Sequence, residues 1–254
     1  MNQKSYYIGV FDSGVGGISV LRQLKQYLPN ERFLYFGDSA NAPYGKRTTA
    51  QVRELTLLAA EKMMAFGLKA LVVACNTATS AAIQTLRETY PDLIVIGIEP
   101  ALKLAADSFP GGRIGVMATQ VTLREEKFDV LLHRFDAGCT VTKIPAPGLV
   151  ELIEAGQADC AETDKLLHQM LSPHIGKLDA LVLGCTHYPF AAKAISRVLG
   201  TEVALLDGGD GTARETKRRL QNAALLREQG EGELILTASG DAEKFLHVAE
   251  TLLR

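Results

Sequence analysis

A short apolar run that ends in cysteine occurs twice in this chain, and this repeat limits the possible folds more than any other feature. The first copy is Ala70–Cys75 (ALVVAC) and the second is Ala180–Cys185 (ALVLGC), 110 residues later. A second pair, Ile8–Val10 and Ile114–Val116, is separated by 106 residues. Any chain with many Val and Ile runs repeats itself loosely, but such chance repetition does not explain a cysteine at the same place in both copies. The chain is therefore predicted to contain two similar halves.

Short apolar runs alternate with longer amphipathic stretches along both halves. In Ile18–Leu28, for example, apolar residues fall on one helical stripe, and Pro29 ends the pattern. Strands that alternate with helices predict parallel sheets covered on both faces, hence an α/β fold. The predicted strands are Tyr6–Phe11, Arg32–Phe36, Ala70–Val73, Leu93–Ile98, Arg113–Met117, Thr140–Ile144, Ala180–Leu183 and Glu202–Leu206.

The repeat also predicts the domain boundaries. The fourth strand of the first half, Leu93–Ile98, corresponds to Glu202–Asp207 at an offset of about 109 residues. The last segment, Gly211–Arg254, holds two helical stretches and the strand-like run Glu233–Thr237, without a further half-repeat. We expect this segment to return to the first half, giving a discontinuous first domain of residues 1–98 and 208–254 and a second domain of residues 99–207.

Composition excludes several classes of function. The chain has 254 residues, a formal net charge of −2 and no run of 18 apolar residues, which argues against nucleic acid or a membrane as the main partner. The N-terminus is polar, so we expect no signal peptide. Four cysteines without a CxxC pair favour free thiols over disulfides or zinc. We expect a cytoplasmic protein without a metal.

Chemically active side chains follow the predicted strands, where ligands bind in open parallel sheets. A single cysteine at a strand end is usually a small buried apolar residue. Two cysteines at equivalent strand ends, Cys75 and Cys185, instead indicate a catalytic pair. Cys139 and Cys160 lie outside such positions and are expected to have no role.

Two neighbouring residues are candidates to assist these thiols. Asp12, at the first strand end, could act on Cys75 or cap the following helix. His187 could make the Cys185 thiol more acidic, relay its proton, or simply stabilise a turn. The glycines after Asp12 do not fit the spacing of nucleotide-binding loops, but amides at a helix N-terminus favour a carboxylate ligand.

Four motifs together resemble the glutamate racemases, in the same order and spacing. They are Asp12-Ser-Gly-Val-Gly-Gly17, Pro43-Tyr44-Gly45, Ala74-Cys-Asn-Thr-Ala78 and Gly184-Cys-Thr-His-Tyr-Pro189. The resemblance implies two similar parallel-sheet α/β domains related by pseudo-twofold symmetry, with the active site in the cleft between them. It implies cofactor-independent interconversion of L- and D-glutamate, which supplies D-glutamate for peptidoglycan synthesis, cell wall biogenesis and cell shape, and it suggests a homodimer.

The resemblance also implies roles for individual residues. Cys75 would take the α-proton from D-glutamate and Cys185 from L-glutamate, with Asp12 and His187 as catalytic partners. Glu154 resembles an acidic residue near the second thiol of some members. The implied substrate contacts are Asp12, Ser13, Pro43, Tyr44, Gly45, Asn76, Thr77, Thr119, Thr122, Thr186 and His187.

Three alternatives remain open at this point. An aspartate racemase of the same superfamily would share the fold, although His187 favours glutamate because aspartate racemases tend to carry an acidic residue there. A thiol hydrolase with Cys185 as nucleophile and His187 as base would not need Cys75. A two-domain module that binds a small ligand would need neither thiol.

Overall fold

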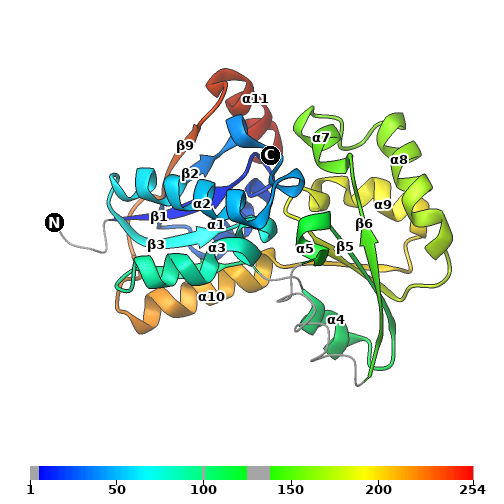
Figure 1. The fold of residues 1–254 in the computed structure, drawn as a ribbon. Helices are drawn as coiled ribbons and strands as arrows, with labels where there is room; N and C mark the ends of the chain where they lie inside the picture. Colours follow the sequence, from blue (N-terminus) through cyan, green and yellow to red (C-terminus); the bar gives the residue numbers. More distant parts are fainter. Residues whose placement is uncertain (1–5, 99–100, 125–137, 254) are drawn as a thin grey trace. The chain divides into compact units, whose positions relative to one another are not determined.

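The chain divides into two compact units, each with its own parallel sheet (Figure 1). The first unit is Met1–Glu99 with Gly209–Arg254, and the second is Pro100–Gly208. This computed structural model describes residues 6–98, 101–124 and 138–253. The prediction of two parallel-sheet α/β domains is confirmed.

The sheet of the first unit has the strand order β4-β3-β1-β2-β9. Helix α2 packs against α3, while α1 packs against α10 and α11, so that helices cover both faces of the sheet. The strands are β1 (Tyr7–Asp12), β2 (Arg32–Gly37), β3 (Leu68–Val73), β4 (Ile94–Gly97) and β9 (Glu233–Ala238). The helices are α1 (Ile18–Tyr27), α2 (Thr49–Met64), α3 (Asn76–Thr89), α10 (Gly209–Asn222) and α11 (Ala242–Leu253), with short 3-10 turns at Ser39–Asn41 and Tyr44–Lys46.

The sheet of the second unit has the order β6-β5-β7-β8. Its strands are β5 (Arg113–Ala118), β6 (Thr140–Pro145), β7 (Ala180–Gly184) and β8 (Ala204–Asp207). Its described helices are α4 (Leu102–Ser108), α5 (Gln120–Arg124), α7 (Leu149–Glu154), α8 (Ala161–Leu171) and α9 (Ala192–Leu199), with 3-10 turns at Ser172–His174 and Tyr188–Ala191. Helices α8 and α9 pack together, and leucines of α7 and α8 join those of β7 in one buried cluster.

The internal repeat predicted from the sequence is present in both strand order and register. The order β2-β1-β3-β4 of the first unit matches β6-β5-β7-β8 of the second. Ile8 pairs with Ala70 in one sheet, and Ile114 pairs with Ala180 in the other. Ala70 pairs in turn with Ile94, and Ala180 with Ala204, so the fourth strands are offset by 110 residues rather than 109. The third and fourth strands thus keep one offset, which places the two cysteine-ending strands in equivalent positions.

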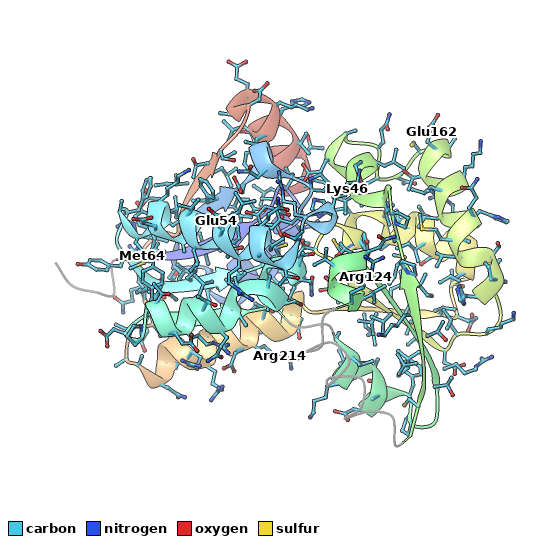
Figure 2. All side chains as sticks on the ribbon, viewed as in Figure 1. Lys46, Glu54, Met64, Arg124, Glu162 and Arg214 are labelled. Carbon is cyan, nitrogen blue, oxygen red and sulfur yellow. The ribbon has the colours of Figure 1, made fainter. Side chains whose placement is uncertain are left out.

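The central strands of each sheet are apolar, except for Lys69 of β3, because both of their faces are covered. All six residues of β3 and all five of β7 are buried. Charged residues lie on the outer faces of the helices, as Figure 2 shows for Glu162 on α8 and Arg214 on α10. Among the described residues, no helix is both long and apolar enough to cross a membrane.

The C-terminal segment adds a fifth strand to the first sheet. Among its described residues, the second unit has no counterpart of this strand. Strand β9 pairs in parallel with β2, from Arg32 with Glu233 to Gly37 with Ala238. The segment before it is fixed by a buried ion pair, in which Lys69 Nζ lies 2.6 Å from Glu31 Oε2. Lys69 Nζ also donates to the Leu225 carbonyl, and Glu31 accepts from the backbone N–H of Arg227. These contacts fix the segment around Leu225 and Arg227 to the first unit.

Candidate active site

Cys75 is the N-cap residue of helix α3. It lies two residues after Val73, the last residue of β3. Its Sγ accepts a hydrogen bond from the Ala78 N–H at 3.4 Å and donates to Ser13 Oγ at 3.8 Å. The residue is 5% exposed. Sulfur at a helix N-terminus faces unpaired amides and the positive end of the helix dipole, which stabilises negative charge on it. The local fold therefore suits Cys75 to act as a thiolate.

The loop after β1 places Asp12 and Ser13 in the same part of the first unit. Asp12 is fully buried, and its Oδ1 accepts from the Gly14 N–H at 2.9 Å. Helix α1 begins after Gly17 without a side-chain cap, so the helix-capping interpretation of Asp12 is wrong. A Cβ on Gly17 would lie 2.7 Å from the Asp12 Cβ, which explains why the loop carries glycine there.

Tyr44 and a second carboxylate, Asp38, form a buried pair next to this loop. Tyr44 Oη donates to Asp38 Oδ2 at 2.7 Å. Burial raises the pKa of Tyr44, and the hydrogen bond to Asp38 and the negative charges at Asp38, Cys75 and Asp12 raise it further. The phenol is therefore a neutral hydrogen-bonding group. Pro43 and Gly45 flank Tyr44 and are partly exposed.

The prediction from the sequence did not include Asp38 among the site residues. The available signal was its position, because Asp38 follows β2 as Asp12 ends β1, and Asp12 pairs with Gly37 in the sheet. Its three side-chain partners, Tyr44, Asn41 and Ser239, come from a turn and from the distant C-terminal segment, which strand spacing alone does not reveal.

Asn76 and Thr77 occupy the first turn of α3, and both are buried. The Asn76 Oδ1 atom is buried and has no hydrogen-bond partner within the described protein. A buried acceptor without a partner is costly to a folded protein. Its presence beside Cys75 favours a ligand that brings an N–H donor to this position.

In the second unit, Cys185 follows β7 and contacts a histidine–carboxylate pair. Cys185 Sγ lies 3.7 Å from His187 Nδ1, and His187 Nε2 lies 2.6 Å from Glu154 Oε1, at the end of α7. Burial of the ring lowers the pKa of His187, but the contacts with Cys185 and Glu154 outweigh it and raise this pKa well above its usual value. The structure thus brings three predicted residues, Cys185, His187 and Glu154, into one chain of side-chain contacts.

Three predicted threonines lie in the same unit. Thr119 and Thr122 face each other across a 3.0 Å contact between their Oγ1 atoms at the start of α5, and the Thr122 N–H donates to Thr119 Oγ1. Thr186, between Cys185 and His187, is buried. Hydroxyls at a helix start can bind a carboxylate together with the free amides of that helix.

The remaining cysteines have different surroundings. Cys139 and Cys160 are partly exposed, and their thiols donate to the carbonyls of Phe109 and Gln157. Neither lies at the carboxyl end of a strand, since Cys139 directly precedes β6 and Cys160 precedes α8. All four cysteines are free thiols. Within the described residues, no group of three His, Cys, Asp or Glu side chains is arranged to hold a metal ion.

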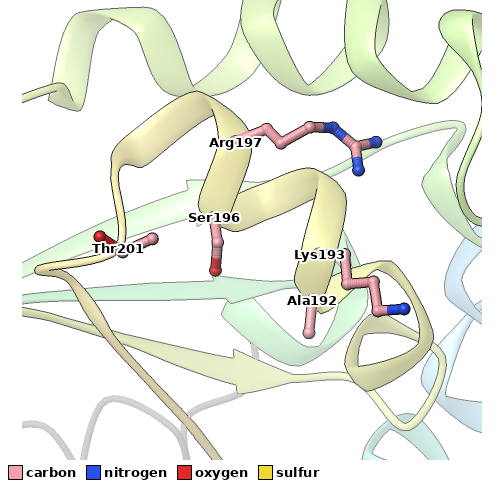
Figure 3. Close-up of a pocket in the computed structure, with 5 residues that line it drawn as sticks. All are labelled: Ala192, Lys193, Ser196, Arg197 and Thr201. Carbon is pink, nitrogen blue, oxygen red and sulfur yellow. The ribbon is translucent and has the colours of Figure 1, made fainter.

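A hollow of about 420 Å³ lies on helix α9, but it contains none of the predicted site residues. It is lined by Ala192, Lys193, Ser196, Arg197 and Thr201 (Figure 3). In the figure the polar side chains of Ser196, Arg197 and Lys193 point in different directions, and Arg197 pairs with Asp159 and Asp164. Without polar groups that converge, this hollow does not resemble a binding site.

Comparison with known proteins decides which class of enzyme carries this arrangement. Residues 8–216 match the family model described as Asp/Glu/Hydantoin racemase. The chain belongs to this racemase family. A glutamate racemase of Clostridium perfringens (strain SM101 / Type A) is 44% identical over 252 residues, which cover 98% of this chain and 97% of the relative.

Solved structures of glutamate racemases have the same fold as this racemase. It superposes on a crystal structure of glutamate racemase from Thermus thermophilus in complex with beta-chloro-D-alanine, with a TM-score of 0.86, 39% identity, and coverage of 99% of this chain and 94% of that one. Glutamate racemase from Escherichia coli, in complex with L-glutamate and the activator UDP-MurNAc-ala, also matches with a TM-score of 0.86, at 30% identity, and coverage of 97% and 95%. This racemase is therefore an isomerase.

Proposed function

We propose that this racemase interconverts L- and D-glutamate without a cofactor, using Cys75 and Cys185 as its two acid/base groups. The observation that carries the proposal is the pair of thiols at equivalent strand ends, each held among groups suited to a thiolate. The full-length similarity to glutamate racemases supports glutamate as the substrate.

Racemisation requires removal of a proton from one face of Cα and delivery of a proton to the other face. A single base tends to return the proton that it removed. Two thiols, one deprotonated and one protonated at the start, meet the requirement and exchange states in each turnover. Cys75 is assigned to D-glutamate and Cys185 to L-glutamate on the basis of the family resemblance.

The surrounding groups would lower the energy of the charged states. The N-terminus of α3 stabilises negative charge at Cys75, and the imidazolium of His187, paired with Glu154, stabilises it at Cys185. Because the Cα proton is a far weaker acid than a thiol, the carbanion-like state also needs fixed dipoles around the substrate. Asp12 is assigned an auxiliary role at Cys75.

Substrate binding is assigned to polar groups of both units. The unpartnered Asn76 Oδ1 suits the substrate ammonium group, since it accepts an N–H donor. The Thr119 and Thr122 hydroxyls suit a carboxylate. The remaining proposed contacts are Ser13, Pro43, Tyr44, Gly45, Thr77, Thr186 and His187.

The wider setting is part of the same proposal. The resemblance suggests a homodimer that supplies D-glutamate for peptidoglycan synthesis, and the composition favours a cytoplasmic protein with no nucleic acid or membrane partner. Light scattering after size-exclusion chromatography measures the oligomeric state, and a mass near that of a single 27.4 kDa chain would contradict the dimer.

The direct test follows optical activity by circular dichroism after protein dialysed against EDTA is mixed with L-glutamate or L-aspartate, without added cofactor. We expect decay of the signal with L-glutamate and much slower change with L-aspartate. Preference for aspartate would favour the aspartate racemase, and no change with either amino acid would favour a binding module.

Thiol variants test the mechanism in the same assay. Removing one acid/base group should cost a factor of at least about a hundred. We expect this loss in both Cys75→Ala and Cys185→Ala, while Cys160→Ala, which removes a partly exposed thiol, should keep wild-type activity. Full activity of Cys75→Ala would contradict the two-thiol mechanism.

A further inference from the structure

Ser239 lies at the end of β9, in the segment that the internal repeat does not account for. Its backbone N–H donates to the Gly37 carbonyl at 3.1 Å, which extends the pairing of β9 with β2 by one residue. Its hydroxyl therefore arrives at the carboxyl end of β2, where Asp38 follows.

The Ser239 hydroxyl makes two hydrogen bonds to the turn that follows β2. Oγ donates to Asp38 Oδ1 at 2.6 Å and accepts from the Ala40 N–H at 3.1 Å. Gly240 lies so close to the same turn that a Cβ on it would be 2.8 Å from Ser39 Oγ and 3.1 Å from the Ala40 nitrogen. The C-terminal segment is thus fitted closely to the turn that carries Asp38.

Asp38 links Ser239 to Tyr44. Each carboxylate oxygen has a short hydroxyl donor, Ser239 at Oδ1 and Tyr44 at Oδ2, and Asn41 Nδ2 lies 3.1 Å from both. Two hydroxyl donors on opposite oxygens fix the rotation of the carboxylate plane. That plane in turn fixes the direction of the Tyr44 Oη–H bond, because the hydroxyl proton must point at Oδ2.

Tyr44 in turn belongs to the surroundings of Cys75. Both are in one buried cluster of the first unit, with Tyr44 1% and Cys75 5% exposed. A buried phenol that changes direction here changes the packing and the local field at the sulfur.

We propose that Ser239 is a positioning residue of the active site: its hydroxyl orients the Asp38 carboxylate, which holds Tyr44 in place in the cluster that contains Cys75. The inference deepens the proposed function and rests on it for its catalytic consequence. Its structural consequence, an effect on Cys75, does not depend on the substrate. The C-terminal segment then helps to position side chains around Cys75 in the first unit.

The test compares wild type with Ser239→Ala and Ser239→Thr by two readouts. The first is steady-state kcat and KM for both enantiomers of glutamate. Loss of a hydrogen bond to a charged group should lower kcat/KM about tenfold in Ser239→Ala. Ser239→Thr keeps the hydroxyl and should recover activity to within about threefold of wild type.

The second readout is alkylation of each thiol by iodoacetamide, resolved by mass spectrometry. We expect the rate at Cys75 to change at least about threefold in Ser239→Ala while the rate at Cys185, in the other unit, stays the same. Thr251→Ala is the matched control, since Thr251 is an exposed residue of α11 whose hydroxyl donates only to the carbonyl of His247 in its own helix. Its activity and both alkylation rates should equal those of wild type.

The two readouts separate the possible failures. An unchanged rate at Cys75 in Ser239→Ala overturns the positioning role, whatever the activity. Equal changes at Cys75 and Cys185 overturn it as well, since they indicate general loosening of the fold. A selective change at Cys75 in a wild-type protein that does not racemise glutamate keeps the positioning role and refutes the proposed function.

Discussion

The two thiols occupy equivalent positions but obtain their charge stabilisation from different groups. Cys75 lies at a helix N-terminus with Ser13 as its side-chain partner, whereas Cys185 lies next to His187, which contacts Glu154. The first sulfur depends mainly on backbone amides, which do not titrate. The second depends on an imidazole, which does. We therefore expect pH to affect the two halves of the reaction differently.

Glu154→Gln tests this difference. Loss of the carboxylate removes one of the contacts that raise the pKa of His187, so this pKa should fall. If the protonated imidazole is the working form, activity is lost as pH rises through the pKa of His187, and a lower pKa brings that loss to lower pH. We expect the alkaline limb of kcat/KM for L-glutamate to move down by about one pH unit or more.

The control for this variant is Glu202→Gln, which neutralises an exposed carboxylate of the same unit. Its pH profile should match wild type. An unchanged alkaline limb in Glu154→Gln would show that His187 does not work through its charge.

At the scale of single elements, most strands could be predicted from the sequence. Predicted and observed strands differ by one or two residues at their ends, because β-branched runs mark buried strands well. Strand β3 begins two residues earlier than predicted, whereas β4 and β8 are shorter than predicted. Leu93 belongs to the turn before β4, where its N–H donates to the Tyr90 carbonyl, and Glu202 is exposed before β8 begins.

The partners of the site residues could not be predicted in the same way. Asp38 and Ser239 are 201 residues apart in the chain, and Glu154 and His187 are 33 apart. Their contacts depend on which strand β9 pairs with and on where α7 ends, and strand spacing does not determine either. The family resemblance pointed to Glu154, while its bond to His187 comes from the structure.

The ion pair Lys69–Glu31 is expected to fix the C-terminal segment. Its side chains are 1% and 0% exposed, so removal of one partner leaves a buried charge without its counter-ion. Lys69→Met should therefore lower the free energy of unfolding by about 3–5 kcal/mol, measured by urea denaturation.

Two further variants decide whether this loss comes from the buried charge. Combining Lys69→Met with Glu31→Leu should restore part of the stability, because no charge then remains buried. Lys103→Met, in an exposed ion pair with Asp107, should change stability little. A loss in Lys69→Met no larger than in Lys103→Met would contradict this account.

Gly37, the last residue of β2, lies between the C-terminal helix α11 and the loop that follows β1. A Cβ there would lie 2.5 Å from Phe245 Cε2 of α11 and 2.7 Å from the Gly14 carbonyl oxygen. Gly37→Ala should cost about 1–3 kcal/mol of stability and lower activity, since the Gly14 backbone belongs to the loop that holds Asp12.

Thermal unfolding measures the loss of stability in Gly37→Ala, and kcat measures its loss of activity. Gly211→Ala is the matched control, because a Cβ at Gly211 in α10 meets nothing within 4 Å. It should leave activity unchanged and stability equal or higher. Equal stability and activity of the two variants would mean that the close approach of α11 to Gly37 has no consequence.

At the scale of the whole molecule, the same order of four strands occurs in both units, and the first unit has β9 in addition. The matching strand orders and registers place Cys75 and Cys185 at equivalent positions of two parallel sheets. Strand β9 and helix α11 then add to the first unit alone, and they bring Ser239 and Phe245 to its strand ends. The repeat accounts for the equivalent positions of the two thiols, and the extension adds Ser239 beside Asp38 and Phe245 beside Gly37 in the first unit.

The central claim is that each thiol serves one face of the substrate, and the isotope content of both enantiomers at early times tests it most directly. The racemase is incubated with L-glutamate in heavy water, and Cα deuterium is measured in the separated enantiomers during the first few per cent of reaction. With two thiols, D-glutamate should carry solvent deuterium from the start, while the remaining L-glutamate keeps its protium. D-glutamate that retains the original protium would contradict the account, since it would show that one base moves the same proton from face to face.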